Sequence, residues 1–113
     1  MAMPHFEVNI NNEGGDPILH LHGEIDFATA PILQNALTKT ITDETEHITL
    51  DFHDVTFLDS EGLKVLLQSL QQLREHGGTM NMHGCNKFIT KTFEILGIQK
   101  LFGIGEEDAK NHM

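Results

Sequence analysis

Ser60 lies in a short polar turn that combines a hydroxyl, two carboxylates and a glycine in the order Asp59-Ser60-Glu61-Gly62. A strand-like apolar run precedes this turn and a leucine-rich run with helical spacing follows it. A serine at such a junction faces free backbone amides and the positive end of the helix dipole. Its hydroxyl is therefore placed for helix capping, for covalent modification or for nucleophilic attack.

Capping is the simplest role for Ser60. As a helix N-cap, alternating with Asp59, it would be worth about 1 kcal/mol. Phosphorylation is the functional alternative, and it would add about −1.5 to −2 charges. Helix-start amides tolerate an anion, so the fold should survive this change. A docked partner would then meet a dianion beside Asp59 and Glu61, and each ~1.4 kcal/mol of penalty weakens binding tenfold.

Catalytic, metal and nucleotide sites are not indicated by the sequence. A nucleophile elbow has the pattern Gly-x-Ser-x-Gly, but Leu58 occupies the first glycine position here. His20 and His22 share one face of a strand without a third metal ligand, and exposed-face histidines are the simpler interpretation. The glycines do not form a phosphate-binding loop. We therefore expect no enzymatic activity, no metal and no cofactor.

Composition limits the classes of partner. The 113 residues include 7 Lys and Arg against 17 Asp and Glu, a net charge of −10, which disfavours nucleic acid. No apolar run approaches the roughly 20 residues of a membrane span, and no signal peptide is recognisable, so we expect a cytoplasmic protein without membrane insertion. Cys85 is the one cysteine, which excludes an internal disulfide, and it is assigned no site role.

The elements that position Ser60 are predicted from a change of hydrophobic period. Alternation puts Ile48, Leu50 and Phe52 on one face of a strand, and it resumes in Val55 and Phe57 after a polar step. Spacing of three and four residues then predicts a helix whose apolar stripe is Leu63, Leu66, Leu67, Leu70 and Leu73. Ser60 is thus predicted at a strand–turn–helix junction.

The remaining chain alternates strands and helices. Strands are predicted over 5–10 and 18–22, joined by a Gly-rich turn, and over 79–83. Thr29 is predicted to cap one helix through its hydroxyl, and Asn86 to cap another with the apolar stripe Phe88, Ile89, Phe93 and Leu96. Residues 98–104 are predicted as a last short strand and residues 106–113 as a frayed helical turn.

Strand–helix–strand units joined by crossovers produce parallel pairs, and the opening hairpin adds an antiparallel edge. We therefore predict a single α/β domain over 1–113. Its mixed sheet would have four to five strands with an N-terminal antiparallel hairpin, covered by three to four helices. Nothing in the sequence demands more than a monomer or weak dimer.

Two motifs carry a family resemblance over nearly the whole chain. Gly23-Glu24-Ile25-Asp26, and Asp-Val-Thr-Phe-Leu-Asp-Ser-x-Gly-Leu over 54–63, resemble the STAS domain of bacterial anti-sigma factor antagonists. The predicted order of elements is similar to that fold. The chain departs from many members at Glu61 and Lys64, where small residues are common.

The resemblance implies a regulatory binding protein. In that family, the unphosphorylated antagonist binds an anti-sigma factor that is also a serine kinase, which frees the sigma factor. Phosphorylation of the serine ends binding, and a serine phosphatase resets it. Carried over, Ser60 is the phosphoacceptor, Asp59 shapes the turn, Gly62 leaves room at the helix start, and Glu24, Asp26 and Glu61 belong to the partner-facing surface. The alternative is a non-switching STAS subunit of a larger assembly, such as a stress-signalling scaffold or a lipid-transport complex.

Overall fold

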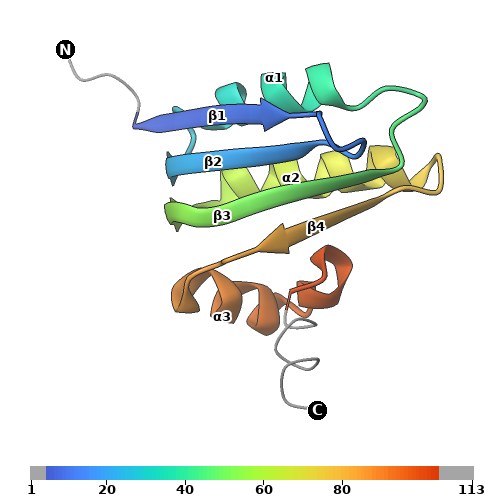
Figure 1. Ribbon diagram of the computed structural model, residues 1–113. Coiled ribbons are helices and arrows are strands. Elements are labelled where there is room, and N and C mark those ends of the chain that lie inside the picture. Colours follow the sequence, from blue (N-terminus) through green and yellow to red (C-terminus); the bar gives the residue numbers. More distant parts are fainter. Residues whose placement is uncertain (1–4, 105–113) are drawn as a thin grey trace.

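The computed structural model describes residues 5–104, which build a four-stranded sheet flanked by helices (Figure 1). The strands lie in the order β1-β2-β3-β4, with β1 and β2 antiparallel and the other two pairs parallel. This arrangement confirms the mixed sheet and its opening hairpin. The elements are β1 Phe6–Asn11, β2 Ile18–Ile25, α1 Ala30–Thr40, β3 His47–Leu58, α2 Ser60–Arg74, β4 Thr79–His83, α3 Lys87–Leu96 and the 3-10 helix η1 Gln99–Phe102.

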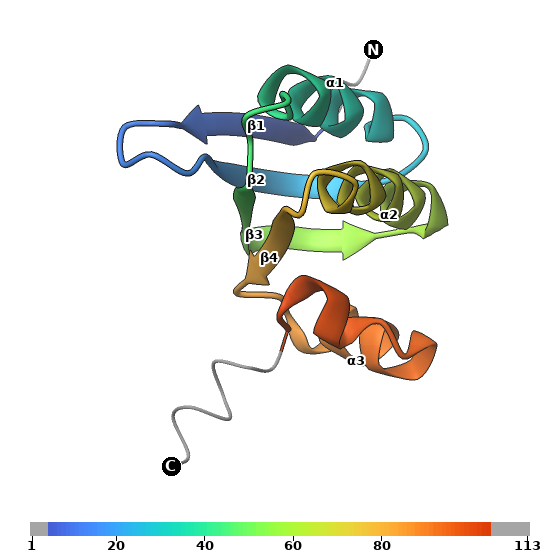
Figure 2. The ribbon, with the colours of Figure 1, turned by 90° about the vertical axis from the view of Figure 1, so that its right-hand side faces the viewer.

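Helices α1 and α2 cover the same face of the sheet (Figure 2). Each is the crossover between two adjacent parallel strands, and because such crossovers share one hand, successive ones in one direction put their helices on one face. The core between the layers holds the inward side chains of all four strands, among them Leu19, Leu50, Phe52 and Met80, each with no exposed surface. Leu66 and Leu73 of α2 close it from the helix side.

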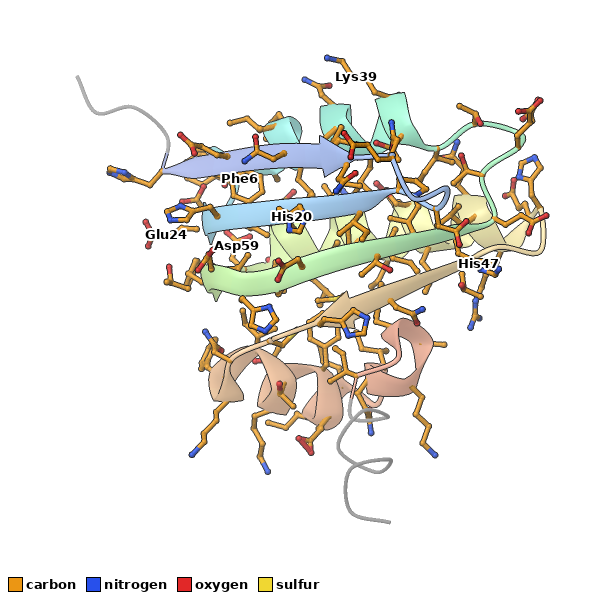
Figure 3. All side chains as sticks on the ribbon, viewed as in Figure 1. Phe6, His20, Glu24, Lys39, His47 and Asp59 are labelled. Carbon is orange, nitrogen blue, oxygen red and sulfur yellow. The ribbon has the colours of Figure 1, made fainter. Side chains whose placement is uncertain are left out.

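The opposite face of the sheet is polar in the part of the chain that the structure describes. Figure 3 shows it towards the viewer, with His20 on β2 and His47 on β3. On the same face, Asp51 of β3 has its carboxylate oxygens 2.9 Å from Nδ1 of His20 and 2.6 Å from Nδ1 of His53. The exposed-face interpretation of His20 and His22 is therefore confirmed.

The predicted strand alternation is wrong at Phe57. Val55 is buried, but Phe57 is 39% exposed and Leu58 takes the inward position after it. The pairing of β2 with β3 contains two register irregularities, one of them between Gly23 and Glu24. Because side chains alternate with period two, one extra residue moves every later side chain to the opposite face.

The C-terminal part differs from two sequence predictions. Residues 98–104 contain the 3-10 helix η1 in place of a strand, because buried Phe102 packs its ring against Phe93 of α3 at 5.4 Å. Ile89 and Phe93 face the core as predicted, but Phe88 and Leu96 are 62% and 53% exposed. Helix α3 lies beyond the β4 edge and buries only a narrow stripe (Figure 1). The predicted turn over 106–113 lies outside the described residues.

Candidate functional site

The candidate site forms where β2 and β3 end side by side. These strands are parallel, and their last pairs are Glu24 with Phe57 and Ile25 with Leu58. The amide of Asp59 donates to the carbonyl of Ile25 over 3.0 Å, which extends the ladder by one residue. The two sequence motifs, more than thirty residues apart, are therefore adjacent. Figure 3 labels Glu24 and Asp59 at this same end of the sheet.

Gly23 allows Glu24 to reach this position. Its φ of +118° lies in a region that favours glycine, and an added Cβ would lie 1.7 Å from the carbonyl oxygen of His5. The amide of Glu24 donates to that same oxygen over 2.8 Å. This hydrogen bond joins the start of β1 to the end of β2, and no residue larger than glycine fits at position 23 beside it. The Glu24 side chain is exposed.

Asp26 organises the turn that leads into α1. Its Oδ1 accepts hydrogen bonds from the amides of Ala28 and Thr29, at 2.9 and 3.0 Å, and its carbonyl accepts from the amide of Ala30. The prediction that Thr29 caps α1 through its hydroxyl is wrong, since its side chain makes no cap bond. Instead, Thr29 is buried and its Oγ1 donates to the carbonyl of Glu24 over 2.8 Å. The Thr29 hydroxyl can face inward because Asp26 already accepts the hydrogen bonds of the amides in this turn.

Asp59, and not Ser60, is the N-cap of α2. Its Oδ1 accepts from the amides of Glu61 and Gly62 at 2.9 and 3.1 Å. Ser60 is the first residue of the helix, is exposed, and has no side-chain hydrogen bond within residues 5–104. The capping interpretation of Ser60 is therefore wrong, because the preceding carboxylate takes the amides that a capping hydroxyl would accept from.

Gly62 allows the helix start to approach the sheet closely. A Cβ there would lie 2.5 Å from Cγ2 of Ile25 and 2.6 Å from Cδ1 of Leu58. Both of those side chains are buried at the ends of β2 and β3. The absence of a side chain at Gly62 therefore determines how close Asp59 and Ser60 lie to the ends of β2 and β3.

Sequence reasoning missed two aromatic side chains at this end of the molecule. Phe27 follows Asp26 in the turn before α1 and is 76% exposed. Phe57 pairs with Glu24 and is 39% exposed. The available signal for Phe27 was its position in the turn directly after Asp26. Phe57 had no such signal, because the register irregularity is not visible in the pattern. Exposed aromatic side chains are typical of protein-binding surfaces.

The described residues offer little for other chemistries. No hydrogen bond within residues 5–104 joins Ser60 to a histidine, and no group of three or more His, Cys, Asp or Glu in that range is placed to hold a metal. None of the helices in that range is long and apolar enough to cross a bilayer. Burial raises the pKa of the Cys85 thiol to about 12, so it is unreactive near neutral pH.

A shallow hollow of about 450 Å³ lies far from Ser60, between the β1–β2 turn and the end of α1. Lys39 and Thr45 are among its lining residues. The hydroxyl of Thr45 already donates to the carbonyl of Thr40, and that of Thr40 to the carbonyl of Ala36. These groups are therefore engaged within the fold, and Ser60 remains the centre of the candidate site.

Comparison with known proteins points to one family. The model of the STAS domain matches residues 7–110. An anti-sigma-B factor antagonist of Staphylococcus aureus is 31% identical over 84 residues, which cover 74% of this chain and 78% of the relative. The crystal structure of an anti-sigma factor antagonist from Mycobacterium paratuberculosis superposes with a TM-score of 0.73 at 26% identity, covering 92% of this chain and 89% of that one.

A further solved structure shares the fold at lower identity. It is the Bacillus cell fate determinant SpoIIAA in its phosphorylated form, with a TM-score of 0.67 and 19% identity. The match covers 96% of this chain and 99% of that one. The architecture is therefore kept where four of five residues differ.

Proposed function

Since this chain belongs to the STAS domain family, we propose that it is an anti-sigma factor antagonist whose binding is switched off by phosphorylation of Ser60. In the unmodified state it binds an anti-sigma factor, which is also the serine kinase, and so releases the sigma factor. A serine phosphatase restores the unmodified state. The protein acts in the cytoplasm as a monomer or weak dimer and is not itself an enzyme.

The observation that carries this proposal is the position of Ser60. Its hydroxyl is exposed and makes no hydrogen bond among the described residues, so a kinase can reach it without unfolding α2. The chain has only one other serine, Ser69, which is 3% exposed on the buried side of the same helix. The fold thus presents one serine and hides the other.

The partner-binding surface in this proposal surrounds Ser60. It consists of exposed Glu24, the turn held by Asp26, and the segment Asp59–Gly62 at the start of α2. Phe27 and Phe57 add apolar area beside these carboxylates. Such a surface suits a partner with an apolar patch and a basic rim. A phosphate at Ser60 would introduce like charge beside Asp59 and Glu61 and oppose a partner docked over the turn.

The deciding experiment is intact-mass measurement with site mapping on the full chain isolated from its native cell under several stresses. The expected result is a single phosphate at Ser60 whose occupancy changes with conditions, and none at Ser69. The Ser60→Ala variant should carry no phosphate there. Absence of phosphate under every condition would reject the switch and favour the non-switching subunit of a larger assembly.

A further inference from the structure

Three amides at the start of α2, those of Glu61, Gly62 and Leu63, are already engaged in the unmodified protein. Asp59 Oδ1 accepts from the amides of Glu61 and Gly62, and the amide of Leu63 donates to the carbonyl of Asp59 over 3.0 Å. An anion on Ser60 therefore finds these donors occupied by a carboxylate. A phosphate there needs another positive group, because its neighbours in the turn, Asp59 and Glu61, are both acidic.

Lys64 lies one helical turn after Ser60, and both residues are exposed on α2. Residues four apart on a helix have Cβ atoms about 5–6 Å apart. Helical side chains lean towards the N-terminus, so the Lys64 stem runs back over the turn that carries Ser60. The order of the charges is also the favourable one, since an acid pairs best with a lysine four residues after it.

Lys64 is also uncommitted. The ion pairs within residues 5–104 all use histidines, and Lys64 has no acidic partner in that range. Arg74, the other cationic residue of α2, lies fourteen residues from Ser60 at the opposite end of the helix, about 21 Å along its axis. Lys64 is thus the cation of α2 that can reach a group on Ser60.

We propose that Lys64 is the intramolecular counter-ion of phosphorylated Ser60. The phosphate oxygens accept from its ammonium group, while Asp59 keeps the amides of Glu61 and Gly62. No covalent step beyond the phosphorylation is involved. Lys64 is then available to a carboxylate of the partner only while Ser60 is unmodified, so phosphorylation adds an anion and withdraws a cation from the same surface. This inference rests on the proposed phosphorylation of Ser60.

The test is a titration of the full chain with phosphoserine incorporated at position 60 during synthesis, followed by phosphorus NMR at low salt. A nearby cation lowers the second pKa of the phosphate, so Lys64→Gln should raise it by about 0.3 of a unit relative to the parent. High salt should shrink this difference. Lys39→Gln is the matched control. It removes one exposed lysine from the last turn of α1 (Figure 3) and should leave the phosphate pKa unchanged.

Two results would overturn the inference. One is an equal phosphate pKa in the Lys64→Gln and Lys39→Gln proteins. The other is displacement of Asp59, seen in a structure of the phosphoserine protein as phosphate oxygens bonded to the amides of Glu61 and Gly62 in its place. Because the phosphoserine is built in, this outcome is independent of whether a kinase modifies the chain in its cell. A failed titration and an absent cellular phosphate are therefore distinguishable.

Discussion

At the scale of single residues, one side chain of the site stabilises the turn and a different one exposes its hydroxyl. Asp59 holds the amides of Glu61 and Gly62, and this leaves the Ser60 hydroxyl without a structural bond among the described residues. A serine that capped the helix would have to give up that bond when modified. Because the neighbouring Asp59 carboxylate caps the helix, a modification of Ser60 breaks no capping bond. The phosphoacceptor and the cap are therefore different residues.

Replacing each of these two residues by alanine should therefore have unequal effects. We expect Asp59→Ala to lower the free energy of unfolding by about 1 kcal/mol because a cap is lost, and Ser60→Ala to change it by no more than a few tenths. Asp59→Asn keeps a capping oxygen and should retain most of the stability. Urea unfolding of the three variants measures this. Equal losses in the two alanine variants would mean that Ser60 shares the capping with Asp59.

At the scale of elements, the site depends on how closely α2 starts against the ends of β2 and β3. Gly62 provides that approach, since a Cβ there would overlap Ile25 and Leu58. The same strand ends carry Glu24 and Phe57. The helix start and the strand ends are therefore in close contact, and a shift of either would move Ser60 relative to Glu24.

Gly62→Ala should accordingly cost about 1–3 kcal/mol of stability, because the methyl group must displace buried side chains. Gly14→Ala is the matched control, since a Cβ at Gly14 meets nothing within 4 Å and its φ is not in the positive region. Thermal or urea unfolding measures both. An unaffected Gly62→Ala protein would contradict the close approach.

At the scale of the whole molecule, the two faces of the sheet have different roles. One is sealed by α1 and α2, and the other is a polar face with Asp51 between His20 and His53 (Figure 3). Burial opposes ionisation of Asp51, but hydrogen bonds from the backbone and ring of His53 and from His20 outweigh it. Together they lower the pKa of Asp51 from 3.8 to about 2. The contact between His20 and Asp51 joins β2 to β3 on the face without helices.

The pH dependence of stability should report this pairing. A carboxyl whose pKa is lowered by folding stabilises the protein fully above its unfolded value, and the contribution is lost as pH falls. The stability advantage of the parent over Asp51→Asn should therefore be constant above about pH 4 and shrink between about pH 4 and pH 2. Urea unfolding at stepped pH measures it. The same comparison for Asp16→Asn, at an exposed carboxyl without a hydrogen bond or ion pair among the described residues, is the control. An advantage independent of pH would contradict the paired carboxylate.

The sequence by itself determined the order of elements and the junction at Ser60. Local periodicity and turn chemistry suffice for that, because strand alternation, helical spacing and the glycines that end helices act over a few residues. Gly97, with φ of +71°, ends α3. The two motifs also identified the family before any geometry was known.

Only the tertiary structure decided which neighbour caps α2, which way Phe57 points and which element comes after α3. Asp59 and Ser60 are both good capping residues, and the ladder bond from Asp59 to Ile25 selects between them. Phe57 turns outward because of register irregularities between strands far apart in the sequence. Residues 98–104 form a turn of helix because Phe102 packs on Phe93. Each outcome depends on contacts between residues that are brought together by the fold. The local pattern of residue types along the sequence contains no information on such contacts.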